Sequence, residues 1–315
     1  MKKIPTLIYY YLRNRRINHA LKKTITFPKV YARIPVFDIE KTNNKIIQWI
    51  NEDRPIAIGR FGASEMFCAS SFEFSIKRLR EKSMEQLCRW SGFFPNDVVH
   101  GNDFNYYMIN AMKDVDMLAV WNLRFEEYYI RKYMRKDICL TYLLNLEPWK
   151  APEKPWTSAL ENKKVLVIHP FENTIQAQYK HRADIFPGTN ILPEFSLKTL
   201  KAVQTIAGEK DERFSNWFDA LDWMYREAMK IDFDVAILGC GAYGLPLTSM
   251  LKASGKKAIH LGGATQILFG IKGKRWDHEA AYDYVRNFYN ENWVYPKQED
   301  EVKNKKIVEN GCYWS

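Results

Sequence analysis

The chain has 315 residues, of which 46% are hydrophobic and 15% aromatic, and its formal net charge at pH 7 is +10. This composition excludes a disordered or low-complexity protein, and no apolar run approaches the ~20 residues that a membrane-spanning helix needs. The five cysteines are odd in number and include no CxxC pair. That pattern argues against a disulfide framework or a zinc cluster and fits a reducing cytoplasm.

The positive charge is concentrated at the start of the chain. Nine Lys and Arg residues lie between Met1 and Pro35, and the first acidic residue is Asp38. An apolar, tyrosine-rich stretch ends at Leu12, and most of these cations follow it. We expect residues 1–35 to form a basic arm that lies on an anionic membrane surface. Two alternatives remain open, namely a nucleic-acid-binding arm and a first helix that packs on the domain through its tyrosines.

After this arm, apolar strand-like runs alternate with helical patterns. In chain order we predict a helix over 41–51, a strand over 55–60, helices over 63–74, 83–90 and 105–112, a strand over 116–121, a helix over 125–134 and a strand over 138–144. Pro148, Pro152 and Pro155 then mark residues 148–156 as a connection, since proline restricts its own φ and the residue before it.

The second half continues the alternation. We predict a strand over 164–168, a helix over 172–183, a strand over 190–192, helices over 197–207 and 215–231, a strand over 234–238, a helix over 245–253 and a strand over 257–261. This order predicts an α/β, Rossmann-like fold, in which helices cover both faces of a mainly parallel sheet. We expect residues 36–147 to form an N-terminal α/β part, residues 157–290 a nucleotide-binding part, and residues 291–315 a C-terminal tail.

A GxGxxG pattern occupies residues 239–244, between a predicted strand and a predicted helix. Such a turn lets backbone amides and a helix N-terminus approach a phosphate. A dinucleotide site would also need an acidic residue about 20 positions later. None occurs from Leu245 through Trp276, so we expect no NAD. The alternative is tight helix–strand packing without a ligand. The residues of this turn assigned to nucleotide binding are Gly239, Gly241, Tyr243 and Gly244.

A second glycine turn follows the last predicted strand. Four glycines, three cations and a tryptophan lie within residues 262–276. Ligands of open parallel sheets sit beyond the strand ends, so this composition predicts an anion-binding mouth with an aromatic wall. The alternative is a solvated basic loop. The residues assigned to this mouth are Gly262, Gly263, Thr265, Gln266, Lys272, Lys274, Arg275 and Trp276.

Two further strand ends carry charged or titratable residues. After the strand 55–60, Arg60 suits a phosphate through its planar guanidinium, and Glu65 suits a base, a metal ion or a sugar hydroxyl. Gly62 and Ser64 lie between them and are assigned to the same site, although an Arg60–Glu65 ion pair is the alternative. At the end of the strand 164–168, His169 could serve as a general base. Since carboxyl ends of parallel strands share one edge, we expect all four turns to converge on one cleft.

The turn Arg60-Phe61-Gly62-Ala63-Ser64-Glu65, with His169-Pro170-Phe171 and the 239–276 stretch behind it, resembles the GT-D-fold glycosyltransferases. This family is found in bacterial polysaccharide and adhesin-glycan assembly, and the likeness covers roughly residues 56–277. The family's turn is Arg-aromatic-Gly-Asp-Gly-Glu, whose Asp-x-Glu pair is associated with a divalent metal and a nucleotide-sugar diphosphate. In this chain Ala63 stands at the Asp position, and only Glu65 is kept.

The resemblance implies a glycosyltransferase, and the cysteine pattern and the basic arm add the expectation that it is cytoplasmic and membrane-associated. It would move a sugar from a nucleotide-diphosphate donor, with UDP as the expected nucleotide, to a glycan or lipid-linked glycan. The cations and glycine turns would stabilise the departing diphosphate. Glu65 or His169 would deprotonate the acceptor hydroxyl, and Trp276 or Tyr243 would supply an apolar platform.

The missing aspartate bears on the expected cofactor. Glu65 would be the one motif carboxylate left to hold Mn²⁺ or Mg²⁺, and a single carboxylate holds such ions weakly. We therefore expect weak metal dependence. If donor binding nevertheless requires an ion, Asp114 and Asp116 are the next carboxylates to consider.

Two other functions fit parts of the pattern. A non-catalytic nucleotide or nucleic-acid binding protein would use the basic arm and the GxGxxG turn, although we expect no nucleic-acid partner. An NADP-dependent oxidoreductase would place Lys256 or Lys257 near a 2′-phosphate.

Overall fold

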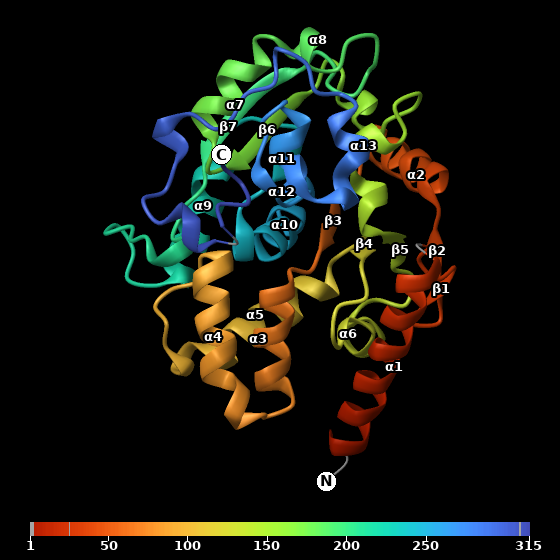
Figure 1. Ribbon diagram of the computed structural model, residues 1–315, viewed down its shortest axis with the longest axis vertical. Helices are drawn as coiled ribbons and strands as arrows, with labels where there is room; N and C mark the ends of the chain where they lie inside the picture. Colours follow the sequence, from red (N-terminus) through yellow and green to blue (C-terminus); the bar gives the residue numbers. More distant parts are fainter. Residues whose placement is uncertain (1–2, 25, 309) are drawn as a thin grey trace.

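The computed structural model describes residues 3–24, 26–308 and 310–315 and consists of a sheet enclosed by two layers of helices (Figure 1). The described residues form a sheet of nine strands. These are β1 (Val30–Tyr31), β2 (Ile34–Phe37), β3 (Ile56–Arg60), β4 (Met117–Val120), β5 (Cys139–Tyr142), β6 (Lys164–His169), β7 (Ser196–Lys201), β8 (Val235–Leu238) and β9 (Lys257–His260).

The strand order is β1-β2-β5-β4-β3-β9-β8-β6-β7, and every pairing except β1 with β2 is parallel. The predicted α/β class with a mainly parallel sheet is therefore confirmed. β3 and β9 come from opposite halves of the chain and pair in the middle of the sheet. The chain adds β4 and β5 on one side of β3 and β6 to β9 on the other, so a topological switch point lies between β3 and β9.

Successive strand residues point to opposite faces of the sheet, which divides the core into two clusters. On β4, Leu118 and Val120 belong to the first cluster, and Met117 and Ala119 belong to the second. The first cluster is covered by α3 (Ala63–Glu73), α4 (Lys77–Ser91), α5 (Gly101–Lys113), α6 (Glu126–Tyr133), α9 (Trp217–Met229) and α10 (Gly244–Ala253). The second is covered by α2 (Ile39–Asn51), α7 (Glu172–Tyr179), α8 (Arg182–Ile185), α11 (Ala264–Leu268), α12 (Lys274–His278) and α13 (Asp283–Arg286).

The predicted basic arm forms α1 (Lys3–Thr24) and the hairpin of β1 and β2. α1 extends from the body towards the N-terminus (Figure 1). Its inner face packs on the first cluster through Leu7, Tyr10, Ile17 and Leu21. Residues 1, 2 and 25 of the predicted arm lie outside the described residues. Within the described part of the chain, no helix combines the length and the apolar character needed to cross a membrane.

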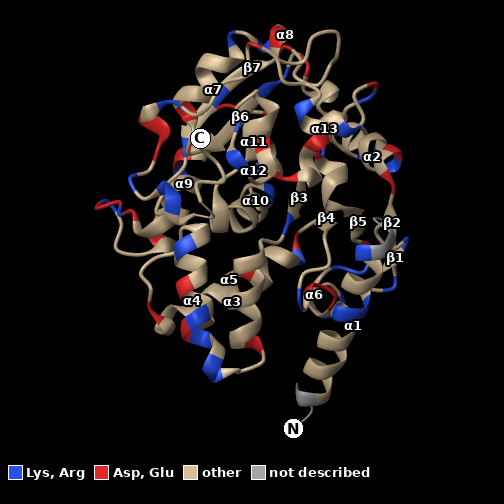
Figure 2. Ribbon diagram, in the orientation of Figure 1, with Lys and Arg blue, Asp and Glu red and all other residues tan. Residues whose placement is uncertain are grey.

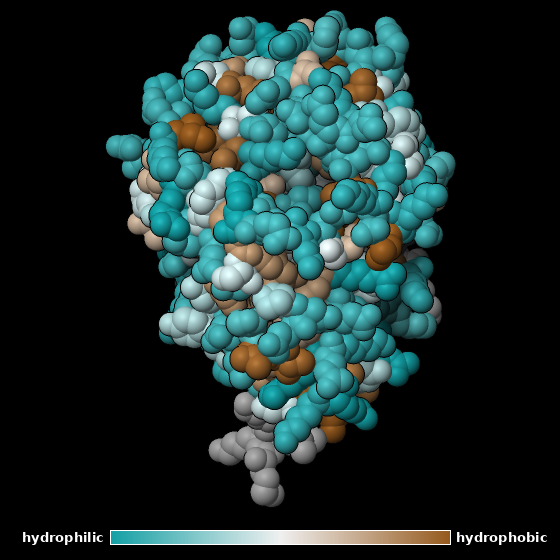
Figure 3. Space-filling view, turned by 90° about the vertical axis from the view of Figure 1, so that its left-hand side faces the viewer, coloured by the Kyte–Doolittle hydropathy of each residue, from teal (hydrophilic) through white to brown (hydrophobic). Residues whose placement is uncertain are grey.

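The surface of the molecule is mainly hydrophilic on the side shown in Figure 3, where hydrophobic residues occur in small separate groups. Ten large hydrophobic side chains of the described residues are exposed, and four of these ten, Ile8, Tyr9, Tyr11 and Leu12, lie on α1. Exposed apolar area is thus concentrated on this helix.

Most predicted helices and strands are present, with α4 beginning earlier than predicted, at Lys77. The predicted helix over 197–207 is wrong, because this segment begins with β7, which pairs with β6 over six residues. Leu197 packs on the second cluster and Leu200 on the first, so these residues face opposite sides of the sheet. Pairing with β6 overrides the helix-like spacing of the apolar residues.

Two smaller predictions of secondary structure also fail. Residues 190–192 form a bend rather than a strand, in which Ile191 and Leu192 are buried anchors. The predicted helix over 172–183 is interrupted, since α7 ends at Tyr179 and α8 begins at Arg182.

The proline-rich connection packs against the body of the protein. Trp149 and Trp156 both belong to the second cluster, and the indole Nε1 of Trp156 donates to the carbonyl of Leu146 at 2.8 Å. The sheet runs through both of the predicted parts, since β3 and β9 join them. The strand ends of both halves therefore meet at one edge.

Candidate functional site

The carboxyl ends of the parallel strands open into a cavity of about 560 Å³, called the cleft below. Residues that follow β3 to β9 line it, together with the C-terminal end of α4. Each of the four predicted turns contributes, for example through Arg60, His169, Gly239 and Gly262. Volumes of this order are typical of small-molecule and cofactor sites.

Glu65 lies in the first turn of α3, against the backbone of Gly62. Gly62 is the N-cap residue of α3, and a Cβ atom on it would overlap the Glu65 carboxylate. The carboxylate is therefore held at the N-terminus of its own helix, where the helix dipole favours a negative charge. The described residues do not form the ion pair between Arg60 and Glu65 that the sequence allowed as an alternative.

Two serine hydroxyls extend this carboxylate into a chain of hydrogen bonds. Ser64 Oγ donates to Glu65 Oε2 at 3.0 Å and lies 2.5 Å from Ser91 Oγ. Because the one hydroxyl proton of Ser64 goes to Glu65, Ser91 is the donor in the second bond. Ser91 ends α4 and lines the cleft. This chain fixes the orientation of the carboxylate.

Arg60 ends β3 and presents its guanidinium to the cleft between an aromatic ring and a glycine turn. Its Cζ lies 5.1 Å from the centre of the Trp121 ring, a cation–π contact. Trp121 is fixed in turn, since its Nε1 donates to the carbonyl of Phe61 at 3.0 Å. On the other side, a Cβ atom on Gly262 would lie 3.2 Å from Arg60 Nη1.

Arg275, on α12, brings a second guanidinium to the same part of the cleft. Its Cζ lies 4.9 Å from the centre of the Tyr313 ring, and its Nη1 donates to Tyr313 Oη at 3.4 Å. Burial raises the pKa of Tyr282 to about 12, and the charges of Arg275 and Arg60 both act against that rise. Burial also raises the pKa of Tyr313, again opposed by both arginines. The two arginines also share the lining of a side pocket of about 40 Å³, so they lie in the same part of the cleft.

His169 ends β6 and is buried in the wall of the cleft. Burial lowers its pKa to about 3, so the imidazole is neutral near pH 7. Its Nδ1 accepts the backbone N–H of Phe171 at 2.9 Å, which leaves the ring proton on Nε2. Such a ring donates to a ligand rather than taking a proton from it. The geometry therefore favours Glu65 over His169 as the base.

The glycines at 239–244 allow three turns to pack closely. A Cβ atom on Gly239 would lie 2.8 Å from the carbonyl of Gly262, and one on Gly241 would lie 2.7 Å from the carbonyl of Ser91. The ring of His260 fills the space beside Gly244. These contacts agree with the packing alternative, while Gly239 and Gly241 also line the cleft.

Five residues assigned to the site from the sequence do not line the cleft. Gly244 lies beneath His260, and Thr265 is fully buried. Lys272 lies over the ring of Tyr295, and Lys274 Nζ donates to the carbonyl of Asn310. Trp276 is 2% exposed and reaches only a side pocket of about 40 Å³. For Lys272, Lys274 and Trp276, contacts with the C-terminal part of the chain direct the side chain away from the cleft.

Of the two residues predicted to supply an aromatic platform, Trp276 does not line the cleft, and Tyr243 lines it with a nearly fully buried side chain. Tyr243 lines the cleft but is 1% exposed, because its ring stacks on Trp217 with centroids 5.1 Å apart. The aromatic side chains that line the cleft and are less deeply buried are Trp90, Trp121, Tyr142, Tyr282 and Tyr313.

The C-terminal segment, predicted as a tail, contributes directly to the cleft through Tyr313 and Trp314. It is held by main-chain bonds from Arg275 N to Cys312 O at 3.1 Å and from Lys274 N to Trp314 O at 2.9 Å. Gln266, in the middle of α11, donates to the carbonyl of Tyr313 at 3.3 Å. No motif marks these residues in the sequence, and their distance along the chain from the glycine turns conceals their role.

The residues of the cleft do not fit a resident divalent cation. Glu65 and Glu279 are the carboxylates that line it. Among the described residues, no three His, Cys, Asp or Glu side chains form a group that could hold a metal ion. An ion with oxygen ligands needs about six of them, and the side chains of the cleft supply only a small part of such a set.

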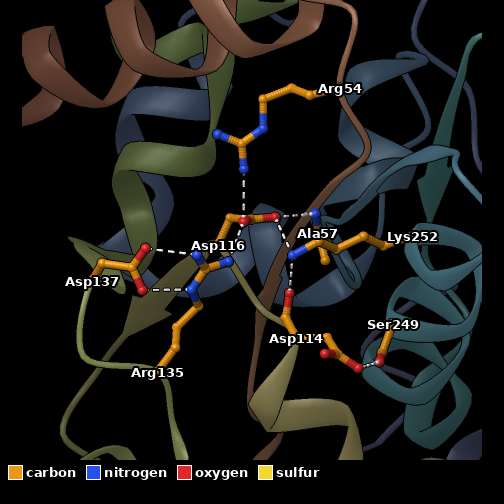
Figure 4. A network of polar contacts seen from close by, with 8 residues as sticks. All are labelled: Arg54, Ala57, Asp114, Asp116, Arg135, Asp137, Ser249 and Lys252. Carbon is orange, nitrogen blue, oxygen red and sulfur yellow. Dashed lines mark hydrogen bonds and ion pairs between the residues drawn. The ribbon is translucent and has the colours of Figure 1, made fainter.

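Asp116 cannot take that role, because it is paired and lies at the opposite edge of the sheet. It precedes β4, and its carboxylate contacts Arg54 at 2.8 Å, Arg135 at 2.9 Å and Lys252 at 2.8 Å (Figure 4). The same carboxylate also accepts the backbone N–H of Ala57 at 2.9 Å. Three cations and one backbone N–H therefore occupy this carboxylate, and its role is to hold the surrounding elements together.

No protein-family model matches the chain, and no curated protein matches its sequence. One similar solved structure is a domain of unknown function 1792 described as having a distinct glycosyltransferase fold. It is 14% identical, with a TM-score of 0.39, and the match covers 84% of this chain and 95% of that chain.

A second similar structure is the selenomethionine-substituted form of a domain of unknown function 1792. It is 14% identical, with a TM-score of 0.38, and the match covers 74% of this chain and 79% of that chain. Because both TM-scores are below 0.5, the activity is inferred from the residues of the cleft and not from these structures.

Proposed function

We propose that this protein is a glycosyltransferase that uses a nucleoside-diphosphate sugar as donor, with UDP as the expected nucleotide. The observation that carries the proposal is the meeting of Arg60 and Arg275 beside a glycine turn, in the same cleft as Glu65. Two guanidinium groups suit a diphosphate, which each can bind through paired N–H donors. A carboxylate in the same cavity suits the activation of a hydroxyl.

The reaction assigned to these residues is a displacement at the anomeric carbon of the donor sugar. The bond from this carbon to the diphosphate oxygen breaks, and its electron pair leaves with the diphosphate. The acceptor hydroxyl oxygen forms the new bond to the same carbon, and its proton passes to the Glu65 carboxylate. Arg60 and Arg275 stabilise the charge that develops on the leaving diphosphate, which is the larger part of the catalytic effect.

The remaining walls of the cleft position the two substrates. His169 offers its Nε2–H as a hydrogen-bond donor to a phosphate or sugar oxygen. The half-buried rings of Tyr142, Tyr282 and Trp121 suit stacking on a nucleobase or a sugar face. We infer that the acceptor is a glycan or a lipid-linked glycan and that the enzyme acts in the cytoplasm.

An NADP-dependent oxidoreductase receives no support from the arrangement. Lys256 and Lys257, proposed for a 2′-phosphate, lie at the start of β9 and so at the edge of the sheet opposite the cleft. Lys256 Nζ donates to the carbonyl of Phe233 at 3.1 Å, and Lys257 Nζ donates to the carbonyl of Ile50 at 2.6 Å.

The proposal is tested by binding and turnover with a panel of nucleoside-diphosphate sugars. Titration calorimetry with UDP and with NADP should show binding of UDP alone. Glu65→Gln should lower sugar transfer or donor hydrolysis by at least about 100-fold while UDP affinity is retained. Glu279→Gln, which alters the other carboxylate of the cleft, is the matched control and should retain most activity. Tight NADP binding, or wild-type turnover in Glu65→Gln, would overturn the proposal.

A further inference from the structure

The outer face of α1 is apolar in the first half of the helix and cationic in the second half. In its first half, Ile8, Tyr9 and Leu12 are 50%, 50% and 57% exposed. In its second half, the exposed residues of the same face are Arg15, Arg16, His19 and Lys22. These positions follow the spacing of three and four residues that places side chains on one side of a helix. Figure 2 shows the cations gathered towards the C-terminal end of α1.

A further cation joins this face from a distant part of the chain. Arg124 is exposed in the loop before α6, and its Cζ lies 5.4 Å from the centre of the Tyr11 ring. Arg15 also contacts that ring, at 5.9 Å. Tyr11 thus lies where the apolar half of the face meets the cationic half. Residues 3–24 contain no Asp or Glu, so nothing in α1 itself neutralises the face.

The inner face of α1 fixes the helix to the body of the protein. The Tyr10 ring packs on Tyr128 with centroids 5.5 Å apart. Asn14 Nδ2 donates to the carbonyl of Asn122 at 2.7 Å, and Asn122 Nδ2 donates to Asn18 Oδ1 at 2.8 Å. Arg13 pairs with Glu127 at the start of α6. Because these contacts occupy the opposite side of the helix, the outer face is left in solvent in a fixed orientation.

We propose that this outer face binds an anionic phospholipid surface and holds the protein on it in one orientation. Ile8, Tyr9 and Leu12 enter the interface between headgroups and acyl chains, where aliphatic and tyrosine side chains are stable. Arg15, Arg16, Lys22 and Arg124 contact the lipid phosphates. The helix therefore meets the membrane with its N-terminal half deeper than its C-terminal half.

A nucleic acid or a second copy of the protein would match fewer residues of this outer face than a lipid surface does. A nucleic-acid backbone would engage the cations but leave Ile8 and Leu12 in water. A second copy of α1 would bury its cations against a face that carries no carboxylate to pair with them. A lipid surface alone supplies both an apolar layer and a layer of anions. Lipid binding does not require that the protein transfer sugar.

The test measures binding of the full chain to sedimented vesicles in the absence of nucleotide. Vesicles of equal parts phosphatidylcholine and phosphatidylglycerol should bind the wild type, and vesicles of phosphatidylcholine alone should bind it weakly. Arg15→Gln/Arg16→Gln/Lys22→Gln should weaken binding by about 100-fold, since each cation near the surface contributes about 5-fold. Ile8→Ser/Leu12→Ser should weaken binding by at least about 10-fold.

The matched control is Lys77→Gln/Arg78→Gln/Lys82→Gln, which removes three exposed cations from α4 and should bind like the wild type. All substituted residues are exposed, so circular dichroism and melting temperature should be unchanged. Equal loss in the control would mean that only net charge matters and would overturn the proposal. So would a wild type that ignores anionic vesicles but dimerises through α1 or binds duplex DNA. Sugar transfer to a soluble acceptor should be equal in all variants, so a failure of lipid binding leaves the proposed function standing.

Discussion

The carboxylate of Glu65 lies over the Cα atom of Gly62, in the space that any side chain at position 62 would need. Gly62 has a φ of −84°, which any residue can adopt, so glycine is required for room and not for backbone freedom. A substitution at position 62 can therefore displace the carboxylate of Glu65 while Glu65 itself stays unchanged.

Gly62→Ala should displace the Glu65 carboxylate and reduce sugar transfer by about 100-fold or more. The melting temperature should fall by a few degrees, since the methyl group strains the first turn of α3. Both are measured on the purified variant. In the Glu65→Ala background the added methyl group has room, so Gly62→Ala should then cost little stability. Unchanged turnover in the single variant would show that the placement of the carboxylate does not matter.

Arg275→Ala should weaken UDP binding more than removal of divalent cations does. We expect a loss of about 10- to 100-fold in affinity, because a charge-assisted contact to phosphate and the support of the Tyr313 ring are both removed. Replacement of Mn²⁺ by EDTA should change affinity only modestly, since the cleft offers few carboxylates. Titration calorimetry of both changes decides the matter. The prediction would be contradicted if UDP binding were lost completely in EDTA while Arg275→Ala left UDP affinity almost unchanged.

The ratio of kcat/KM between the wild type and a variant that lacks His169 should be the same at every pH between about 5 and 8. The pKa of His169 is lowered to about 3 by burial, so this residue remains neutral across this range. His169→Ala should lower kcat/KM by about 10-fold or more through loss of a donor in the cleft. The pH profiles of wild type and variant should run parallel. A limb near pH 6.5 that disappears in the variant would identify His169 as a titrating base.

Glu126 should make the protein less stable as the pH rises. Burial raises its pKa to about 8 from an ordinary value of 4.5, although the N–H groups of Trp121 and Leu123 donate to it. The folded state therefore holds a proton that the unfolded chain releases above pH 4.5, and the free energy of unfolding falls until the pH passes about 8.

The control is Glu126→Gln, which keeps a carbonyl acceptor for those donors and does not titrate. Urea unfolding at about pH 6 and pH 8 should show the wild type losing about 2 kcal/mol relative to the variant over that interval. A constant difference between the two proteins would mean that Glu126 is ionised in the folded state throughout.

The sequence by itself determined the class of fold and the turns that form the cleft. Buried strands such as 164–168 and 234–238 are short β-branched runs bounded by polar or glycine turns, and this pattern depends only on local chemistry. Because parallel strands place their carboxyl ends on one edge, the sequence alone predicts that Arg60, His169 and the glycines at 239 and 262 share one cleft.

Tertiary structure alone decided what the local pattern left ambiguous. The segment 196–201 has apolar residues at spacings that suit a helix, and only its pairing with β6 makes it a strand. Lys272 and Lys274 could not be separated from Arg275 by composition, because the partner rings and carbonyls that direct them come from Tyr295, Tyr313 and Asn310. The direction of a side chain depends on neighbours distant in sequence.

The same reason explains the residues that no motif revealed. Ser91 meets Ser64 because α4 packs on α3, and Tyr313 meets Arg275 because the C-terminal segment returns across α12. Likewise, the basic arm was evident from its charge, but which side of α1 faces solvent was fixed by its contacts with Asn122 and Tyr128. Local sequence sets the type of most elements and their turns, whereas contacts between elements set which side chains share a site.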